Sequence, residues 1–156
     1  EKQIFEQMSR DIAKYGVKYG FAYNSNFDED KFRRTALELN LHNPLDDITV
    51  VDIWHNAQEW ICDTAPYLEF CNEHNLRTLS GKYLPTSVEG VTAYLNADKD
   101  FVEEHTALSD VQWELRILCE LGKRGCNIFQ EGKNMGCLTP EGEWIYPMHK
   151  RKEVED

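Results

Sequence analysis

The sequence lacks several features that would place a protein in a functional class at once. No apolar stretch approaches the roughly 20 residues that a membrane-spanning helix needs, and no signal-peptide pattern opens the chain. A glycine-rich loop of the kind that cradles nucleoside triphosphates is also missing. We therefore expect no membrane partner, and nothing indicates a nucleoside-triphosphate hydrolase.

Basic residues are few: 17 Lys and Arg stand against 28 Asp and Glu, for a net charge of −11. This balance disfavours a protein that coats nucleic acid, because binding to many phosphates needs clustered Lys and Arg. The acidic charge balance is compatible with an enzyme that binds the end of one nucleic-acid strand through metal ions. The ions would then supply the positive charge, and several carboxylates would be their ligands.

The five cysteines are odd in number and lack the regular spacing of a disulfide framework. We therefore expect reduced thiols and a cytoplasmic protein. Cys71 and His74 form one C-x-x-H pair, whereas structural zinc sites normally show two close pairs. Buried thiols are the preferred interpretation.

His55 lies between apolar neighbours and is expected to be a hydrogen-bonded histidine rather than a catalyst.

Composition and patterning nevertheless describe a folded α/β domain. Apolar residues are 41% and aromatic residues 12% of 156, enough for a substantial core. Runs of aromatic and β-branched residues predict two strands, at 17–24 and 48–52. Apolar periodicity predicts helices at 1–15, from about 28 onward, and at 53–62, 65–74, 86–96 and 106–121. Two strands are too few for a stable sheet, so others should lie in the irregular C-terminal part or upstream of Glu1.

Two of these helices allow more detailed predictions. The second should bury one apolar face, made by Phe32, Ala36, Leu37 and Leu39. At the start of the helix at 86–96, Thr86 and Glu89 have the spacing of a capping box.

Asp28 stands where the second helix should begin, directly after the polar turn that ends the first predicted strand. An acid at this position can simply cap the helix or interact with its dipole. The same position lies beyond the C-terminal end of a strand, where ligands collect in α/β proteins. The local sequence leaves both interpretations open.

His105 and Asp110, in the segment EEHTALSDVQWEL, pose the same choice. Thr106 or Ser109 can cap the helix that follows, with Asp110 as an ordinary first-turn acid. Alternatively, His105 is a general base and Asp110 a hard oxygen ligand for Mg²⁺ or Mn²⁺. Taken alone, the segment favours the capped helix.

Together, two segments favour the functional interpretation. YNSNFDEDKF and, further along, FVEEHTALSDVQWE resemble the second and third motifs of the DEDDh family of 3′–5′ exonucleases. The third motif is a His, four residues and an Asp, matched by His105 and Asp110. The second places an Asp after an Asn-containing strand end, matched by Asn24, Phe27 and Asp28.

The resemblance implies a ribonuclease H-like fold and two-metal hydrolysis that releases nucleotides from DNA 3′ ends, with RNA as a second candidate substrate. It also implies two Mg²⁺ or Mn²⁺ ions. By the resemblance, Asp110 would bind metal directly and Asp28 would hold the second ion, directly or through water. His105 would take the proton from the attacking water.

The first motif of the family, an Asp-x-Glu on the first strand, does not occur in the sequence. The resemblance therefore describes residues 1–122 as a partial exonuclease domain, helix-rich and truncated at its N-terminus, with its first strands missing. Residues 123–156 are then an irregular C-terminal extension. Because the missing motif supplies two of the four acidic ligands, we expect this chain to bind catalytic metals poorly and to be nearly inactive.

Two other hypotheses remain open. The chain is alternatively a non-catalytic member of the same fold that binds nucleic acid or another protein, as its acidic balance and absent first motif favour. It is otherwise an unrelated helical interaction protein in which the two motifs are coincidental. An Asp-x-Glu upstream of Glu1 would distinguish the enzyme from the non-catalytic module. The unrelated protein is distinguished by whether Asp28, His105 and Asp110 converge within about one metal coordination shell.

Overall fold

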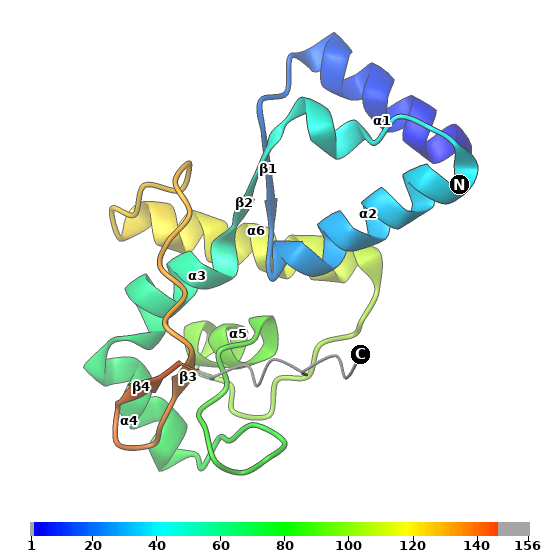
Figure 1. The fold of residues 1–156 in the computed structure, drawn as a ribbon. Coiled ribbons are helices and arrows are strands. Elements are labelled where there is room, and N and C mark those ends of the chain that lie inside the picture. Colours follow the sequence, from blue (N-terminus) through cyan, green and yellow to red (C-terminus); the bar gives the residue numbers. More distant parts are fainter. Residues whose placement is uncertain (1, 147–156) are drawn as a thin grey trace, which may run out of the picture.

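The computed structural model describes residues 2–146, which form a helix-rich mixed α/β structure around a small parallel sheet (Figure 1). The mixed α/β class expected from the sequence is confirmed. The helices are α1 (Lys2–Tyr15), α2 (Ser25–Leu39), α3 (Ile53–Ala57), α4 (Ala65–Glu73), α5 (Val88–Asn96) and α6 (Ala107–Lys123). A 3₁₀ turn, η1 (Pro44–Asp47), follows α2, and α3 continues into one turn of π-helix, η2 (Gln58–Cys62). None of the helices in this range has the length and apolar character to span a membrane.

The parallel sheet consists of the two strands that the sequence predicts. β1 (Tyr19–Ala22) pairs with β2 (Thr49–Asp52), with Tyr19 opposite Thr49 and Ala22 opposite Asp52. α2 lies on the connection between them, as parallel pairing requires a crossover. Two further short strands, β3 (Cys137–Leu138) and β4 (Trp144–Ile145), form a separate antiparallel pair. The C-terminal strands therefore do not extend the parallel sheet, and within residues 2–146 the outer edges of β1 and β2 have no strand partner.

The core lies where α3, η2, α4, α5 and α6 meet. Its fully buried side chains include Ile53, Ile61, Tyr67, Val91 and Ile117. The C-terminal segment joins this core, because Leu138 of β3 is 2% exposed and belongs to the same cluster. Residues 123–146 thus pack against the helices that the resemblance covers.

One detailed prediction for the helices is wrong, and a second holds only in part. The N-cap of α5 is Ser87, whose hydroxyl accepts the Gly90 N–H at 3.3 Å. Thr86 does not cap it, because its hydroxyl accepts the indole N–H of Trp54 at 3.1 Å. Thr86 has the spacing of a capping box, but its hydroxyl is used in the contact with Trp54 instead.

The predicted buried face of α2 is only partly buried. Ala36 is buried and Phe32 stacks on Phe5 of α1, with ring centroids 5.3 Å apart. Leu37 and Leu39, by contrast, are 75% and 38% exposed. The reason is the narrow sheet: α2 runs away from β1 and β2 (Figure 1), so no strand in the described part of the chain lies against its far end.

Candidate metal centre

Asp28 lies in the first turn of α2, just past the C-terminal end of β1. The chain turns between them at Asn24, which adopts the left-handed conformation with φ of 62° and ψ of 54°. Asn tolerates this conformation better than most residues. Partial removal from water, and then the charges of Asp52 and Glu29, raise the pKa of the Asp28 carboxyl above its ordinary value.

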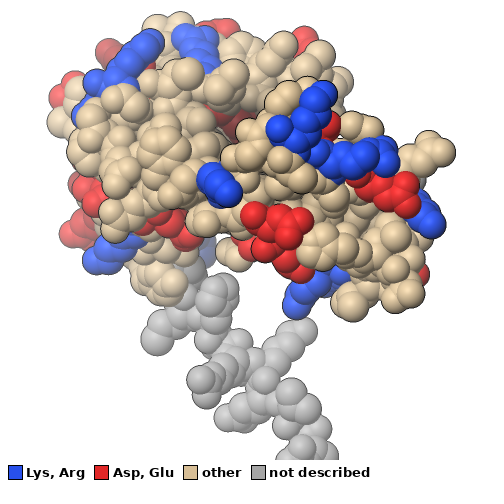
Figure 2. All heavy atoms as spheres, turned by 90° about the horizontal axis from the view of Figure 1, so that it is seen from above, with Lys and Arg blue, Asp and Glu red and all other residues tan. Residues whose placement is uncertain are grey.

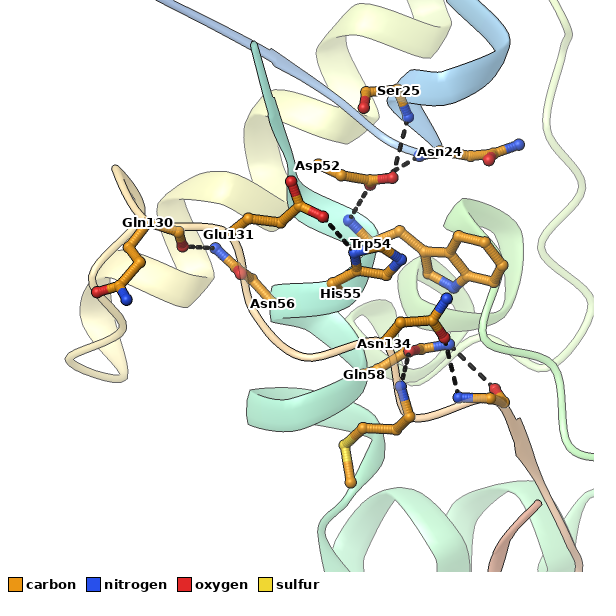
Figure 3. Close-up of polar contacts among 12 residues, drawn as sticks. Asn24, Ser25, Asp52, Trp54, His55, Asn56, Gln58, Gln130, Glu131 and Asn134 are labelled. Atoms are coloured by element: carbon orange, nitrogen blue, oxygen red, sulfur yellow. Dashed lines mark hydrogen bonds and ion pairs between the residues drawn. The ribbon is translucent and has the colours of Figure 1, made fainter. Parts of the chain in front are cut away.

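Asp52, at the end of β2, fixes this turn. Its side chain is buried and accepts three backbone N–H groups (Figure 3). The donors are Asn24 at 3.0 Å, Ser25 at 3.1 Å and Trp54 at 2.9 Å. Two of them start α2 and the third starts α3. One carboxylate therefore holds both strand ends together and orients the turn of helix that carries Asp28.

His105 and Asp110 lie on either side of the N-terminus of α6. Thr106 is its N-cap, with its hydroxyl accepting the Ser109 N–H at 3.3 Å and the Ser109 hydroxyl accepting the Thr106 N–H in return. The predicted helix cap is thus confirmed. Asp110 is half-buried in the first turn. The His105 side chain is 74% exposed, and its Nδ1 lies 3.9 Å from the Glu103 carboxylate.

The acids of these segments converge on Glu114, one turn beyond Asp110 on α6. Burial raises the pKa of Glu114 to about 7, and the charges of Asp28, Glu103 and Asp110 act in the same direction. The Tyr23 backbone N–H, which donates to the Glu114 carboxylate, acts in the opposite direction. Charges influence one another strongly only at short range. We call Glu114 and the three residues whose charges act on its carboxyl in this way, Asp28, Glu103 and Asp110, the acidic centre.

A tighter group of potential ligands adjoins the acidic centre. Glu89, Glu103 and His105 each offer a ligand atom, and these atoms lie within 4.8 Å of one another. Across residues 2–146, no other set of three or more His, Cys, Asp or Glu side chains meets this distance. Carboxylate and imidazole donors of this kind suit divalent ions such as Mn²⁺. The group includes His105 but neither Asp28 nor Asp110.

The predicted site residues are therefore brought together in part. Asp28 and Asp110 surround the same carboxylate, Glu114, and His105 lies beside Glu103 of the same centre. All three do not fall within one coordination shell in this structure. Their roles as metal ligands and general base remain predictions.

Four acids near these residues did not emerge from the sequence: Asp52, Glu89, Glu103 and Glu114. Glu114 had a usable signal, because it follows Asp110 by four residues and so lies on the same face of the helix. Glu103 also had one, since it lies two residues before His105. Asp52 and Glu89 could not be found this way, because their neighbours come from other segments of the chain.

Polar side chains of α3 and η2 bind the C-terminal segment instead of the acidic centre (Figure 3). The ring of His55 is buried, and its Nδ1 lies 2.7 Å from the Glu131 carboxylate. The Gln58 amide donates to the Gly136 carbonyl at 3.1 Å and accepts the Met135 N–H at 2.9 Å. His55 is thus a hydrogen-bonded histidine, as expected.

The burial of Glu114, together with the repulsion within the acidic centre, should appear in the pH dependence of stability. The folded chain holds the Glu114 proton more tightly than the unfolded chain, whose pKa is near 4.5. The contribution of this carboxyl to stability is therefore fully present below pH 4.5 and is lost as pH rises through about 7. We expect Glu114→Gln to raise the free energy of unfolding at pH 8 by about 1 kcal/mol, after allowance for solvent screening of a half-buried group.

Urea denaturation at pH 5 and pH 8 measures this effect. The gain at pH 8 should shrink at pH 5, where the wild-type carboxyl is mostly protonated. Glu104→Gln, which removes an exposed acid from the neighbouring loop, is the matched control and should change little at either pH. Equal gains at both pH values would contradict a charge effect at Glu114.

Comparison with known proteins gives no further guide to the site: no family model matches this chain, and no curated protein or solved structure matches it.

Proposed function

We propose that this chain is the larger part of a two-metal-dependent 3′–5′ exonuclease domain of the DEDDh type, acting on DNA 3′ ends. The observation that supports the proposal most is the acidic centre. Asp28 and Asp110 were selected from two motifs far apart in the sequence, and both act on the carboxylate of Glu114. The support is partial, because Asp28, His105 and Asp110 do not share one coordination shell in this structure.

The residues of the centre fit a divalent metal site by their chemistry. Like charges held together raise each other's pKa, and a bound cation relieves that repulsion. Mg²⁺ and Mn²⁺ prefer such hard oxygen donors. In this proposal Asp110 binds metal directly, and Asp28 holds a second ion directly or through water. When bound, two ions would stabilise the attacking and leaving oxygens of the phosphodiester.

His105 is the general base of the proposal. Its ring is exposed, and so it is accessible to a substrate and to water. The neighbouring Glu103 carboxylate can orient the ring and stabilise the positive charge that it gains on taking a proton. The capping box of Thr106 and Ser109 anchors the backbone directly after His105.

Two features of the structure agree with a domain that lacks its first strands. A parallel sheet of two strands is unusually small. In addition, α6 exposes Val111 and Leu115 beside a hollow of about 210 Å³ that Phe21 of β1 and Ile53 also line. Strands added beside β1 would cover this apolar surface. They would also bring an Asp-x-Glu motif close to Glu114, which lines the same hollow.

An exonuclease assay on single-stranded DNA with a 5′ label tests the proposal. The chain alone, with Mn²⁺, is expected to show turnover close to background. A chimaera in which the first strands of a DEDDh exonuclease, with their Asp-x-Glu, precede Glu1 is expected to shorten the DNA from its 3′ end. A chimaera that folds, as judged by circular dichroism, yet shows no metal-dependent shortening would contradict the proposed function.

The second candidate is a non-catalytic module of the same fold that binds nucleic acid or protein. The missing Asp-x-Glu favours it for this chain. The surface does not favour broad contact with nucleic acid, because acidic and basic side chains are interspersed on the face shown in Figure 2. DNA binding without shortening, by a chimaera whose metal site is complete, would support this candidate.

A further inference from the structure

A cavity of about 720 Å³ adjoins the acidic centre. It lies between the loop that joins α4 to α5, which curls beside α5 in Figure 1, and α5 itself. Its lining includes Arg77 and Tyr83 from that loop, Glu89 from α5, and Lys99 and Phe101 from the segment before α6. This volume is within the range of sites for small molecules.

The charge of the cavity differs from that of the chain. Its lining contains two cations, Arg77 and Lys99, and one acid, Glu89, whereas the whole chain carries −11. The Arg77 guanidinium hydrogen-bonds two backbone carbonyls and the side chain of Asn72. No carboxylate of residues 2–146 lies within ion-pair distance of it, while Arg33 and Arg124 each pair with an acid. The charge of Arg77 is thus available to an anion.

Lys99 and the aromatic rings complete the recognition surface. Lys99 is exposed, and its ion pair with the exposed Asp100, at 3.6 Å, costs little to break. Tyr83 and Phe101 line the same cavity, and Phe101 packs edge-to-face on Trp113 with ring centroids 4.9 Å apart. Cations next to aromatic rings are the combination that binds a phosphate together with a nucleobase.

We propose that this cavity binds one nucleotide of a single-stranded substrate, with its phosphate at Arg77 and Lys99 and its base against the aromatic rings. The location supports this, since Glu89 lines the cavity and also lies within 4.8 Å of Glu103 and His105. A strand with one nucleotide here therefore passes directly beside the acidic centre. The inference rests on the proposed function for the identity of the polymer, but the binding itself needs no metal.

Titration of the folded chain with thymidine 5′-monophosphate, in the presence of EDTA, tests the site. The intrinsic tryptophan fluorescence should change saturably, because Trp113 contacts Phe101. Thymidine, which lacks the phosphate, should bind at least about tenfold more weakly. Absence of saturable binding, or equal binding of both compounds, would overturn the proposal.

Variants identify the cavity as the place of binding. Arg77→Gln and Lys99→Gln should each weaken the monophosphate about five- to tenfold and leave thymidine unchanged. Lys123→Gln, at the far end of α6, removes another exposed cation and should have no effect. If Arg77→Gln disturbs the fold, Lys99→Gln decides alone, since Lys99 is exposed. Unchanged affinity for the monophosphate in Lys99→Gln would overturn the proposal.

The titration also separates this inference from the proposed function. Asp110→Asn should bind the monophosphate in EDTA as the wild type does, because no metal takes part. If the chain binds the monophosphate but the folded chimaera is inactive, the exonuclease proposal is contradicted and the cavity proposal stands. If Arg77→Gln and Lys99→Gln change neither the rate of an active chimaera nor its affinity for the monophosphate, the exonuclease proposal stands and the cavity proposal is overturned.

Discussion

Replacement of Asp52 by Ala is expected to lower the free energy of unfolding by about 4 kcal/mol. The Asp52 carboxylate is 1% exposed and accepts the N–H groups of Asn24, Ser25 and Trp54 at 2.9 to 3.1 Å. Hydrogen bonds to a charged acceptor are each worth about 1.5 kcal/mol or more. Alanine would remove all three and leave their donors unpaired at the end of the parallel sheet.

Urea denaturation followed by circular dichroism measures this loss. Asp52→Asn should lie between wild type and Asp52→Ala, because its amide oxygen still accepts while its NH₂ group faces an N–H donor. Asp47→Ala is the matched control: Asp47 is exposed and pairs with His42 at 2.9 Å, so its loss should cost no more than about 1 kcal/mol. Similar costs for Asp52→Ala and Asp47→Ala would show that the three N–H bonds do not hold the strand ends.

Replacement of Asp52 should also disturb the geometry of the acidic centre. Asn24 and Ser25 start the helix turn that carries Asp28, so releasing them frees the position of Asp28 relative to Glu114. In a chimaera with a complete set of acids, Asp52→Asn is therefore expected to lower activity even at temperatures where the protein remains folded.

His105→Ala is expected to lower the turnover of the active chimaera by about 10²- to 10⁴-fold, the usual contribution of a general base. The half-saturating concentration of Mn²⁺ should not change, because the base does not hold the metal. Asp110→Asn should behave differently. In the proposed site it removes a metal ligand, so it should both lower turnover and raise the Mn²⁺ concentration that half-saturates the enzyme.

Steady-state assays at several Mn²⁺ concentrations distinguish the two roles. Glu104→Gln, next to His105 and exposed, is the matched control and should change neither quantity. If His105→Ala instead raises the Mn²⁺ requirement, His105 acts as a metal ligand with Glu89 and Glu103, whose ligand atoms lie within 4.8 Å of it. Full activity of His105→Ala would contradict both roles.

Several elements could be predicted because they depend on local sequence. The β-branched and aromatic runs around β1 and β2 are local signals, and both strands form within the predicted ranges. The cap at Thr106 was also predictable, since its partner Ser109 is three residues away. Asp28, His105 and Asp110 are a different case, because the resemblance to a family, and not the local sequence, made them candidate site residues.

Other features were not predictable, because they depend on contacts between distant segments. Thr86 has capping-box spacing, but the indole of Trp54 takes its hydroxyl. Leu37 fits an apolar face, but the sheet beside α2 is too narrow to cover it. Arg77 resembles any solvated arginine until the loop around it encloses a cavity together with Lys99.

The sequence by itself determined the mixed α/β class and the positions of β1, β2 and the main helices. Those properties follow from side chains within one or two turns of each other, whereas Asp28, His105 and Asp110 became candidates only through the resemblance of two distant segments to one family. Only the tertiary structure decided that Glu103 and Glu114 join Asp28 and Asp110, and that Asp52 holds the turn beneath them. The reason is physical: charge repulsion and buried hydrogen bonds depend on distance in space, which the parallel pairing of β1 with β2 and the docking of α6 set.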